Sequence, residues 1–353
     1  MVPTHDAAIG VDLGGTKTAA ALVGADGAVL WRLSTSTPAR QGPAAILDAV
    51  AFLAERLAAE ARSRSLALAG LGLGSAGVID PATCQVVSAT DVLTGWAGTD
   101  LRAGLLERLG GAGGAVGRVE AVNDVHAHAL GEAWLGAARG TSTALLVAFG
   151  TGIGGSFLVD GRPVSGARSV AGHFGHVPSA AAGGLVCTCG AMGHLEAIAS
   201  GPALHRFYQR LGGDPRAADT RAVFERARAG EAPAVGAIRR AARAAGSALG
   251  GFANSLDPEA LVLSGGLADA GPLWWDAVRE SFAEELVPAL RHVEPVPALL
   301  GGDAATIGAA SLVLRPPAAS VPAGPSGQSA QPATPGQSSP SVQFQGASRV
   351  ADR

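Results

Sequence analysis

The chain is poor in aromatic residues and cysteines, carries no excess of positive charge and contains no long apolar run. Its formal net charge of −3 gives no electrostatic reason to expect a nucleic-acid partner. No uninterrupted stretch of about 18 apolar residues predicts a membrane span. Three cysteines do not make a disulfide framework, and the first residues lack the basic and apolar regions of a signal peptide. We therefore expect a cytoplasmic protein with no membrane partner.

What the chain does contain is glycine-rich turns placed directly after apolar strands. The first turn reads DLGGTK at residues 12–17 and follows the apolar run 7–11. Glycine N–H groups can approach an anion unhindered, the threonine and lysine add a hydroxyl and a positive charge, and the aspartate can hold a hydrated Mg²⁺. A plain hairpin turn uses the same residues, so this turn alone leaves both interpretations open. The candidate phosphate and Mg²⁺ groups here are Asp12, Gly14, Gly15, Thr16 and Lys17.

Two further turns repeat this pattern in the second half of the chain. Residues 147–159 read VAFGTGIGGSFLV, with an apolar strand on each side of the turn, and a Gly-Gly pair follows the apolar strand 260–263. Three such turns in two halves indicate a nucleotide held between two similar domains. The additional phosphate candidates are Gly150, Thr151, Gly152, Gly154, Gly265 and Gly266.

The order of expected elements suggests a βββαβαβα unit used twice, with a boundary in the glycine-rich stretch 113–117. We expect an N-terminal domain over residues 1–115, a larger domain over 116–303 and a helix over 304–315 that returns to the first domain. A helix is also expected over 43–63, with one apolar face made by Ala45, Ile46, Ala49, Phe52, Leu53 and Leu57. Residues 316–353 are rich in Pro, Ser, Gly and Gln and are predicted to be disordered.

A metal-ligand pattern lies between Gly172 and Glu196. Two cysteines in a CxC arrangement stand near two histidines in a glycine-rich loop, which suits a tetrahedral Zn²⁺. Four protein ligands leave no open position for water, so the metal is interpreted as structural. Ordinary surface histidines beside reduced cysteines are the alternative. The candidate ligands are His176, Cys187, Cys189 and His194.

Together these motifs resemble the ROK family of sugar kinases and sugar-responsive repressors, in the actin-like ATPase superfamily. The resemblance covers about residues 8–314 and rests on DLGGTK, the Asn-Asp pair at 123–124, FGTGIGG, the cysteine-histidine loop, LSGG and GGDAATIGAA. It implies an α/β fold of two actin-like (ribonuclease H-like) domains with a cleft between them. It also implies ATP, Mg²⁺, a structural Zn²⁺, a hexose or N-acylhexosamine substrate and a homodimer. Repressors of the family carry a DNA-binding segment before the first turn, and only about a dozen residues precede Asp12 here, which favours a kinase.

The resemblance also assigns roles around the sugar. Asp124 is expected to be the general base that accepts a hydroxyl proton, although an N-cap of the following helix is an alternative role for it. The expected sugar contacts are Gly77, Thr90, Asn123, Asp124, His173, His176 and Glu196. The chain departs from the family pattern at His194, where most members have Cys, and at His173, where the usual residue is Glu. The second departure leaves open both altered sugar selectivity and a non-catalytic sugar sensor, and a kinase that uses polyphosphate is a third possibility.

Overall fold

The computed structural model describes residues 6–110 and 116–315, so the expected tail 316–353 and most of the expected boundary stretch lie outside the described residues. Within these ranges, the chain forms two five-stranded sheets and a small strand pair, β5 (Val78–Asp80) with β6 (Gln85–Ser88). In spatial order, the first sheet comprises β3 (Val29–Ser36), β2 (Lys17–Gly24), β1 (Ala7–Leu13), β4 (Leu68–Ser75) and β7 (Val119–Asn123). The second comprises β10 (Arg162–Pro163), β9 (Ile153–Val159), β8 (Thr143–Phe149), β11 (Ala260–Ser264) and β12 (Pro295–Pro297).

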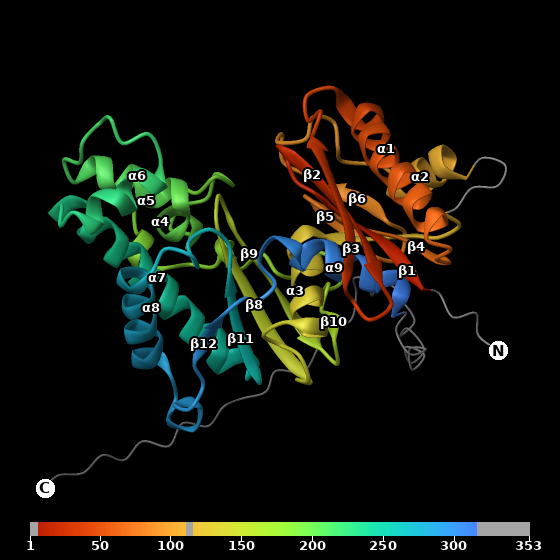
Figure 1. Cartoon of the computed structure of the whole chain (residues 1–353). Coiled ribbons are helices and arrows are strands. Elements are labelled where there is room, and N and C mark those ends of the chain that lie inside the picture. Colours follow the sequence, from red (N-terminus) through yellow and green to blue (C-terminus); the bar gives the residue numbers. More distant parts are fainter. Residues whose placement is uncertain (1–5, 111–115, 316–353) are drawn as a thin grey trace, which may run out of the picture. The chain divides into compact units, whose positions relative to one another are not determined.

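The two sheets share one topology (Figure 1). In the first, β1 pairs antiparallel with β2 and parallel with β4, while β7 continues the parallel side. In the second, β8 likewise pairs antiparallel with β9 and parallel with β11, while β12 continues the parallel side. This repeat confirms the expected α/β fold with two similar halves. Because the carboxyl ends of parallel strands meet at one edge, the turn after β1 and the Asn-Asp pair after β7 lie at the same edge of the first sheet.

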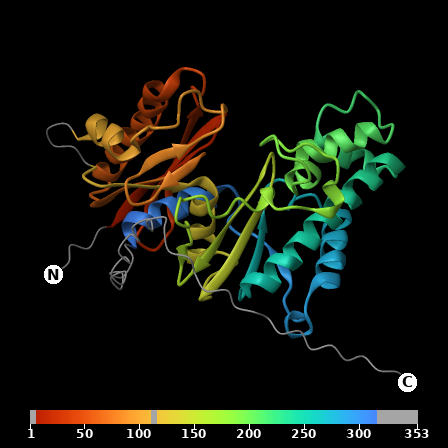
Figure 2. The same cartoon turned by 180° about the vertical axis from the view of Figure 1, so that it is seen from behind.

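Helices cover these sheets, and two of them begin and end within one residue of the helices expected over 43–63 and 304–315. The first half contains α1 (Gly42–Ser63), α2 (Leu101–Leu109) and α3 (Asp124–Leu135). The second half contains α4 (Glu196–Ala199), α5 (Gly201–Arg210), α6 (Thr220–Arg228), α7 (Ala232–Leu256), α8 (Pro272–Glu285) and α9 (Ala304–Leu314). Seen from behind, α7 and α8 lie side by side next to the second sheet (Figure 2). Among the described residues, we find no helix that combines the length and the apolar character a membrane crossing needs.

The apolar face of α1 is slightly different from the expected one. Ile46, Leu53 and Leu57 are buried as expected, and Val50 lies between them in the same core. Phe52 was expected on this face, but 54% of it is exposed, and the Arg56 guanidinium lies over its ring, 5.8 Å from the centroid. The assignment of Phe52 is wrong because it lies about 100° around the helix from Leu53, outside the buried stripe.

The expected domain boundary after residue 115 does not coincide with the division between the sheets. Strand β7 was assigned to the second domain, yet Leu71–Ser75 of β4 pairs in parallel with Val119–Asn123 of β7. The first sheet therefore ends at Asn123, and α3 is the segment that leads to the second sheet. The strand lies in the first sheet because its buried residues, Val119 and Ala121, pack into the same core as β1, β4 and α1.

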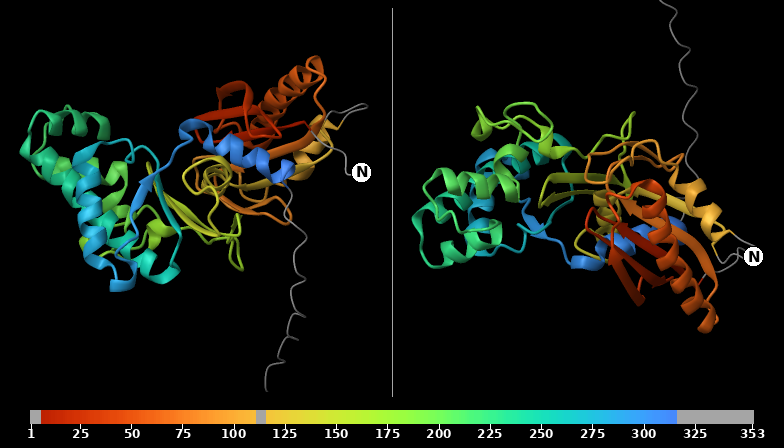
Figure 3. Two further views of the ribbon diagram at one scale, coloured as in Figure 1. Left: turned by 60° about the horizontal axis from the view of Figure 1, so that its bottom comes forward. Right: turned by 90° about the horizontal axis from the view of Figure 1, so that it is seen from above.

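Helices α3 and α9 are in close contact with each other, and α9 lies along the first sheet on the face opposite α1 (Figure 3). Glycines make this packing possible. A Cβ on Gly10 of β1 would lie 1.9 Å from the Thr306 carbonyl oxygen, and one on Gly72 of β4 would lie 1.8 Å from that of Ala309. A Cβ on Gly308 of α9 would lie 1.7 Å from the Ala127 carbonyl oxygen of α3. Any larger residue at these positions would force the backbones apart.

We predict that Gly308→Ala lowers the free energy of unfolding by about 2 kcal/mol or more, since the added methyl group meets backbone rather than a flexible side chain. Gly251→Ala is the matched control, because Gly251 is also helical but a Cβ there meets nothing within 4 Å. The control should leave stability unchanged or raise it by up to about 1 kcal/mol. Denaturant unfolding of both variants measures the difference. Equal stability of the two variants would contradict the close-contact argument.

Candidate functional site

One cavity of about 430 Å³ brings together most of the residues that the sequence singled out. It lies where β7 meets α3, next to the turn between β8 and β9 and the loop 169–176. The expected residues that line it are Gly77, Asn123, Asp124, Gly150, Thr151, Gly152, Gly154, His173, His176, Glu196 and Gly265. Sugar-type and phosphate-type candidates therefore share one cavity.

Other expected residues do not line this cavity. Thr90 is exposed in the loop after β6, and it does not line the cavity with the other expected sugar contacts. The first turn, residues 14–17, and Gly266 are likewise outside the lining residues. The Val92 side chain of the loop after β6 lies against Gly15, while Thr16 and Lys17 of the turn are exposed.

Asn123 and Asp124 are positioned by the junction between strand and helix. Asn123 is the N-cap of α3: its side-chain oxygen accepts from the Val125 N–H at 2.9 Å, and its amide donates to the Gly77 carbonyl at 2.9 Å. The N-cap is therefore Asn123 rather than Asp124. Burial raises the pKa of the Asp124 carboxyl, and hydrogen bonds from Val125 and Asn123 partly oppose this. A raised pKa moves the group toward the range in which a carboxylate works as a general base.

Asp12, at the end of β1, lies close enough to Asp124 for the two charges to interact. Burial raises the pKa of Asp12 to about 6, the negative charge of Asp124 adds to the effect, and Lys17 opposes it. Two neighbouring, partly buried carboxylates whose pKa values are both raised favour a cation. Oxygen ligands of this kind suit Mg²⁺, so the raised pKa of Asp12 fits its expected role.

Glu196 connects the second turn to the cysteine loop. One carboxylate oxygen accepts from the Ile153 N–H at 2.9 Å, and the other accepts from the Thr188 hydroxyl. Thr188 stands between Cys187 and Cys189. The side chain is buried, with 8% exposed, yet it lines the cavity. Glu196 therefore fixes the phosphate-type turn relative to the cysteine loop as well as facing the cavity.

The protonation pattern of His173 follows from its hydrogen bond. Its Nδ1 lies 2.8 Å from the Val170 carbonyl oxygen, which can only accept, so Nδ1 carries the proton. In the neutral ring, Nε2 is then free to accept a hydrogen bond from a ligand in the cavity. The His173 and His176 rings are stacked, with centroids 6.0 Å apart.

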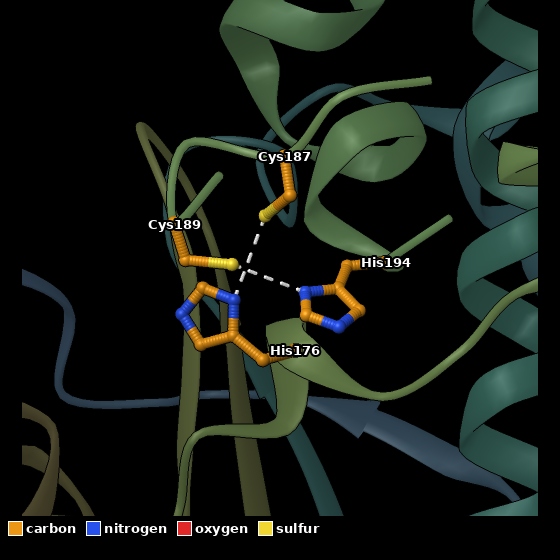
Figure 4. Close-up of side chains that lie close together, drawn as sticks. All are labelled: His176, Cys187, Cys189 and His194. Atoms are coloured by element: carbon orange, nitrogen blue, oxygen red, sulfur yellow. Dashed lines mark hydrogen bonds between the residues drawn. The ribbon is translucent and has the colours of Figure 1, made fainter. Parts of the chain in front are cut away.

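The four expected metal ligands converge from the loop before α4 (Figure 4). Their ligand atoms all lie within 4.8 Å of one another. Cys187 Sγ is 3.5 Å from His176 Nδ1, and Cys189 Sγ is 3.2 Å from His194 Nδ1. Ligands of a tetrahedral Zn²⁺ are separated by about 3.3 to 3.8 Å, so the donor set and its spacing fit this metal. His176 also lines the cavity, so the ligand cluster adjoins the cavity wall.

Sequence reasoning missed two histidines on α3. His126 lines the cavity, and its Nε2 lies 3.3 Å from the Ala171 carbonyl oxygen. His128 Nε2 lies 3.0 Å from the hydroxyl of Ser264. Burial lowers the pKa of both histidines. The signal that could have found them is two polar rings in an otherwise apolar helix directly after the Asn-Asp pair.

Comparison with known proteins gives consistent matches along the described chain. A profile described as the ROK family matches residues 8–316. A glucokinase from Thermotoga maritima is 31% identical, and the match covers 86% of this chain and 96% of that protein. An N-acetylmannosamine kinase from Escherichia fergusonii is 32% identical, with 86% and 97% covered. A solved ROK family glucokinase from Streptomyces griseus, in complex with glucose and AMPPNP, is 31% identical with a TM-score of 0.71, covering 87% of this chain and 99% of that one.

We predict that Asp12→Asn stabilises the metal-free protein at pH 7.5. The folded state holds the Asp12 proton more tightly than the unfolded state, so its contribution to stability falls as pH rises from about 4 to about 6 and stays low above that. Removing the carboxylate should raise the free energy of unfolding by roughly 2 kcal/mol at pH 7.5 and by much less near pH 4. The exposed carboxylate control Asp276→Asn should show no such pH-dependent gain. Denaturant unfolding at both pH values provides the measurement.

Proposed function

Because the chain belongs to the ROK family, we propose that it transfers the γ-phosphoryl group of ATP to a hydroxyl of a hexose or N-acylhexosamine. Its glucokinase and N-acetylmannosamine kinase relatives share the class of ATP-dependent sugar kinase. The observation that carries the proposal is a single cavity in which Asp124 lies together with the glycine turn at 150–154 and with Gly265. A base and a phosphate cradle in one cavity are what phosphoryl transfer to a hydroxyl requires.

Asp124 is proposed as the general base. A sugar hydroxyl is a poor nucleophile near neutral pH, so a carboxylate that accepts its proton during attack accelerates the reaction. The N-cap of Asn123 holds the first turn of α3 in place and leaves the Asp124 carboxylate at the cavity. The backbone N–H groups of the turn after β8 are suited to the phosphates, because glycines there leave the N–H groups accessible.

The sugar is proposed to lie against Gly77, Asn123, Asp124, His173, His176 and Glu196. Several of these groups already have protein partners. The Asn123 amide donates to the Gly77 carbonyl, and both Glu196 oxygens accept hydrogen bonds. His173 has a free acceptor nitrogen, so it is the group most able to select among sugar hydroxyls. The choice of sugar should therefore depend strongly on His173.

Two metal ions complete the proposal. Asp12 would hold Mg²⁺, which offsets the negative charge of the phosphates when bound. His176, Cys187, Cys189 and His194 would hold a structural Zn²⁺. This ligand set belongs to the loop that also carries Thr188, the partner of Glu196, so an ordered loop keeps the cavity wall in place. A homodimer, implied by the family resemblance, and a cytoplasmic location are also part of the proposal.

We predict that Asp124→Asn lowers kcat by about 10² to 10⁴ while the affinity for sugar changes little. The amide keeps the shape of the side chain but cannot accept the hydroxyl proton. Release of ADP measured across glucose, mannose, fructose, glucosamine, N-acetylglucosamine and N-acetylmannosamine gives kcat, and calorimetry gives the sugar affinity. Asp276→Asn serves as the control. A variant with more than about a third of wild-type kcat would overturn the role of Asp124, and a wild type that binds sugar without turnover would indicate a sensor.

His173→Glu is predicted to change the rank order of kcat/KM among the same six sugars. A carboxylate accepts two hydrogen bonds and donates none, whereas the neutral imidazole presents one acceptor to the cavity. His292→Glu is the matched control, because His292 is exposed and the change in charge is the same. Ratios within about twofold of the wild type for every sugar would mean that selectivity is determined elsewhere.

Purified protein is expected to contain about one zinc per chain, which elemental analysis measures. Cys187→Ala should remove most of the zinc and increase hydrogen exchange in residues 172–196, because the loop loses its cross-link. Cys84→Ala should retain the zinc, since Cys84 is buried in the core of the first half. Full activity with less than about half an equivalent of zinc would contradict the proposed role.

A further inference from the structure

One face of α3 carries three polar side chains in an otherwise mostly apolar helix. Asp124, His128 and Glu132 are spaced four residues apart, so they lie along the same side of the helix. Asp124 faces the cavity, and Glu132 is fully buried and accepts hydrogen bonds from the Leu299 and Leu300 N–H groups. His128 lies between them and bonds to Ser264. The base is therefore the first member of a polar row, and the other two members bond to segments of the second half.

Ser264, the hydrogen-bond partner of His128, lies next to the glycine turn that lines the cavity. Ser264 is buried and is the last residue of β11, directly before Gly265. Gly265 lines the cavity with φ +82°, and a Cβ there would lie 2.4 Å from the Phe149 carbonyl oxygen. Phe149 in turn ends β8, directly before the turn at Gly150. The His128–Ser264 hydrogen bond, 3.0 Å long, therefore links the base helix to the point where both phosphate-type turns of the second half begin.

The bond joins groups that are 136 residues apart in the chain. His128 lies one helical turn after Asp124, so its anchorage limits how far the start of α3 can shift relative to β11. Phosphoryl transfer depends on the distance between the base and the transferred group, and a displacement of about 1 Å can cost on the order of 10²-fold in rate. A polar bond to the strand end restrains this distance in a way that apolar packing alone does not, because hydrogen bonds are directional.

We propose that His128 is a positioning residue which, through Ser264, holds the helix that carries Asp124 at a fixed distance from the nucleotide turn at Gly265. The proposal rests on the proposed kinase function and deepens it. His128 is not among the residues that line the cavity, so it is not placed to contact sugar or nucleotide there. Its effect is on the alignment of two groups that do, and it should therefore appear in kcat rather than in sugar affinity.

A double-mutant cycle on His128→Ala and Ser264→Ala tests the proposal in the full-length protein with saturating ATP and sugar. Each single variant should lose about 10-fold or more in kcat, with the sugar KM within about twofold of wild type. The double variant should lose no more than the worse single variant, because both remove the same bond. Losses that multiply in the double variant, or wild-type kcat in His128→Ala, would overturn the proposal.

Two further variants separate alignment from loss of folding. His128→Gln keeps a hydrogen-bonding group at the reach of Nε2, whereas His128→Met has a similar shape without one. We expect His128→Gln to recover at least half of the wild-type kcat and His128→Met to match His128→Ala. Equal kcat in the Gln and Met variants would refute the bond. His205→Ala is the matched control, since His205 is also half-buried and bonds through Nε2 to the Ala217 carbonyl away from the cavity.

The outcome also separates this inference from the proposed function. If the wild type phosphorylates none of the six sugars, the proposed function fails before any variant is compared. If the wild type is active and the cycle is additive, the proposed function stands and the role of His128 is wrong.

Discussion

The contact of α3 with α9, and of α9 with the first sheet, is the constraint on which the rest of the structure depends. Backbone meets backbone at Gly308 and Ala127, at Gly131 and Ala304, and at Gly72 and Ala309. Such contacts leave no space for side chains. The distance between these elements is therefore set by backbone atoms, which cannot adjust as flexible side chains can. Both helices follow the last strand of their own half, and the two repeats are joined through them.

Helix α3, which makes two of these backbone contacts, also carries the proposed general base. Asp124 begins α3, and Glu132 ends its polar row with a fully buried carboxylate. A buried carboxylate is tolerated only when hydrogen bonds replace its lost hydration, and the N–H groups of Ala137, Leu299 and Leu300 provide them. Because Leu299 and Leu300 lie just before α9, Glu132 holds the two helices together at the end opposite the cavity. The position of the proposed base thus follows from the backbone contacts of α3 at Ala127 and Gly131 and from the hydrogen bonds of Glu132.

The cavity and its surroundings contain carboxylates whose charged forms a bound cation would stabilise. Burial raises the pKa of Asp124, which lines the cavity, and of Asp12, which interacts with Asp124 but is not a lining residue, so a bound cation would favour the charged forms of both. Glu196 and Asn123 already form hydrogen bonds with the protein backbone and with Thr188, which restrain both side chains in the cavity wall. His173, with one committed nitrogen and one free one, is the adjustable member of the set.

The sequence alone was sufficient for the strand-turn patterns, the α/β class with two similar halves, and the convergence of four metal-type ligands, because local periodicity and short spacings carry these signals. It could not place β7 in the first sheet, since strand partners are chosen by the core that forms around Val119 and Ala121. Nor could it show that Thr90 faces solvent while His126 faces the cavity, or that His128 meets Ser264 across 136 residues. Those outcomes depend on how distant elements pack, and only the tertiary structure brings the partners within hydrogen-bonding distance.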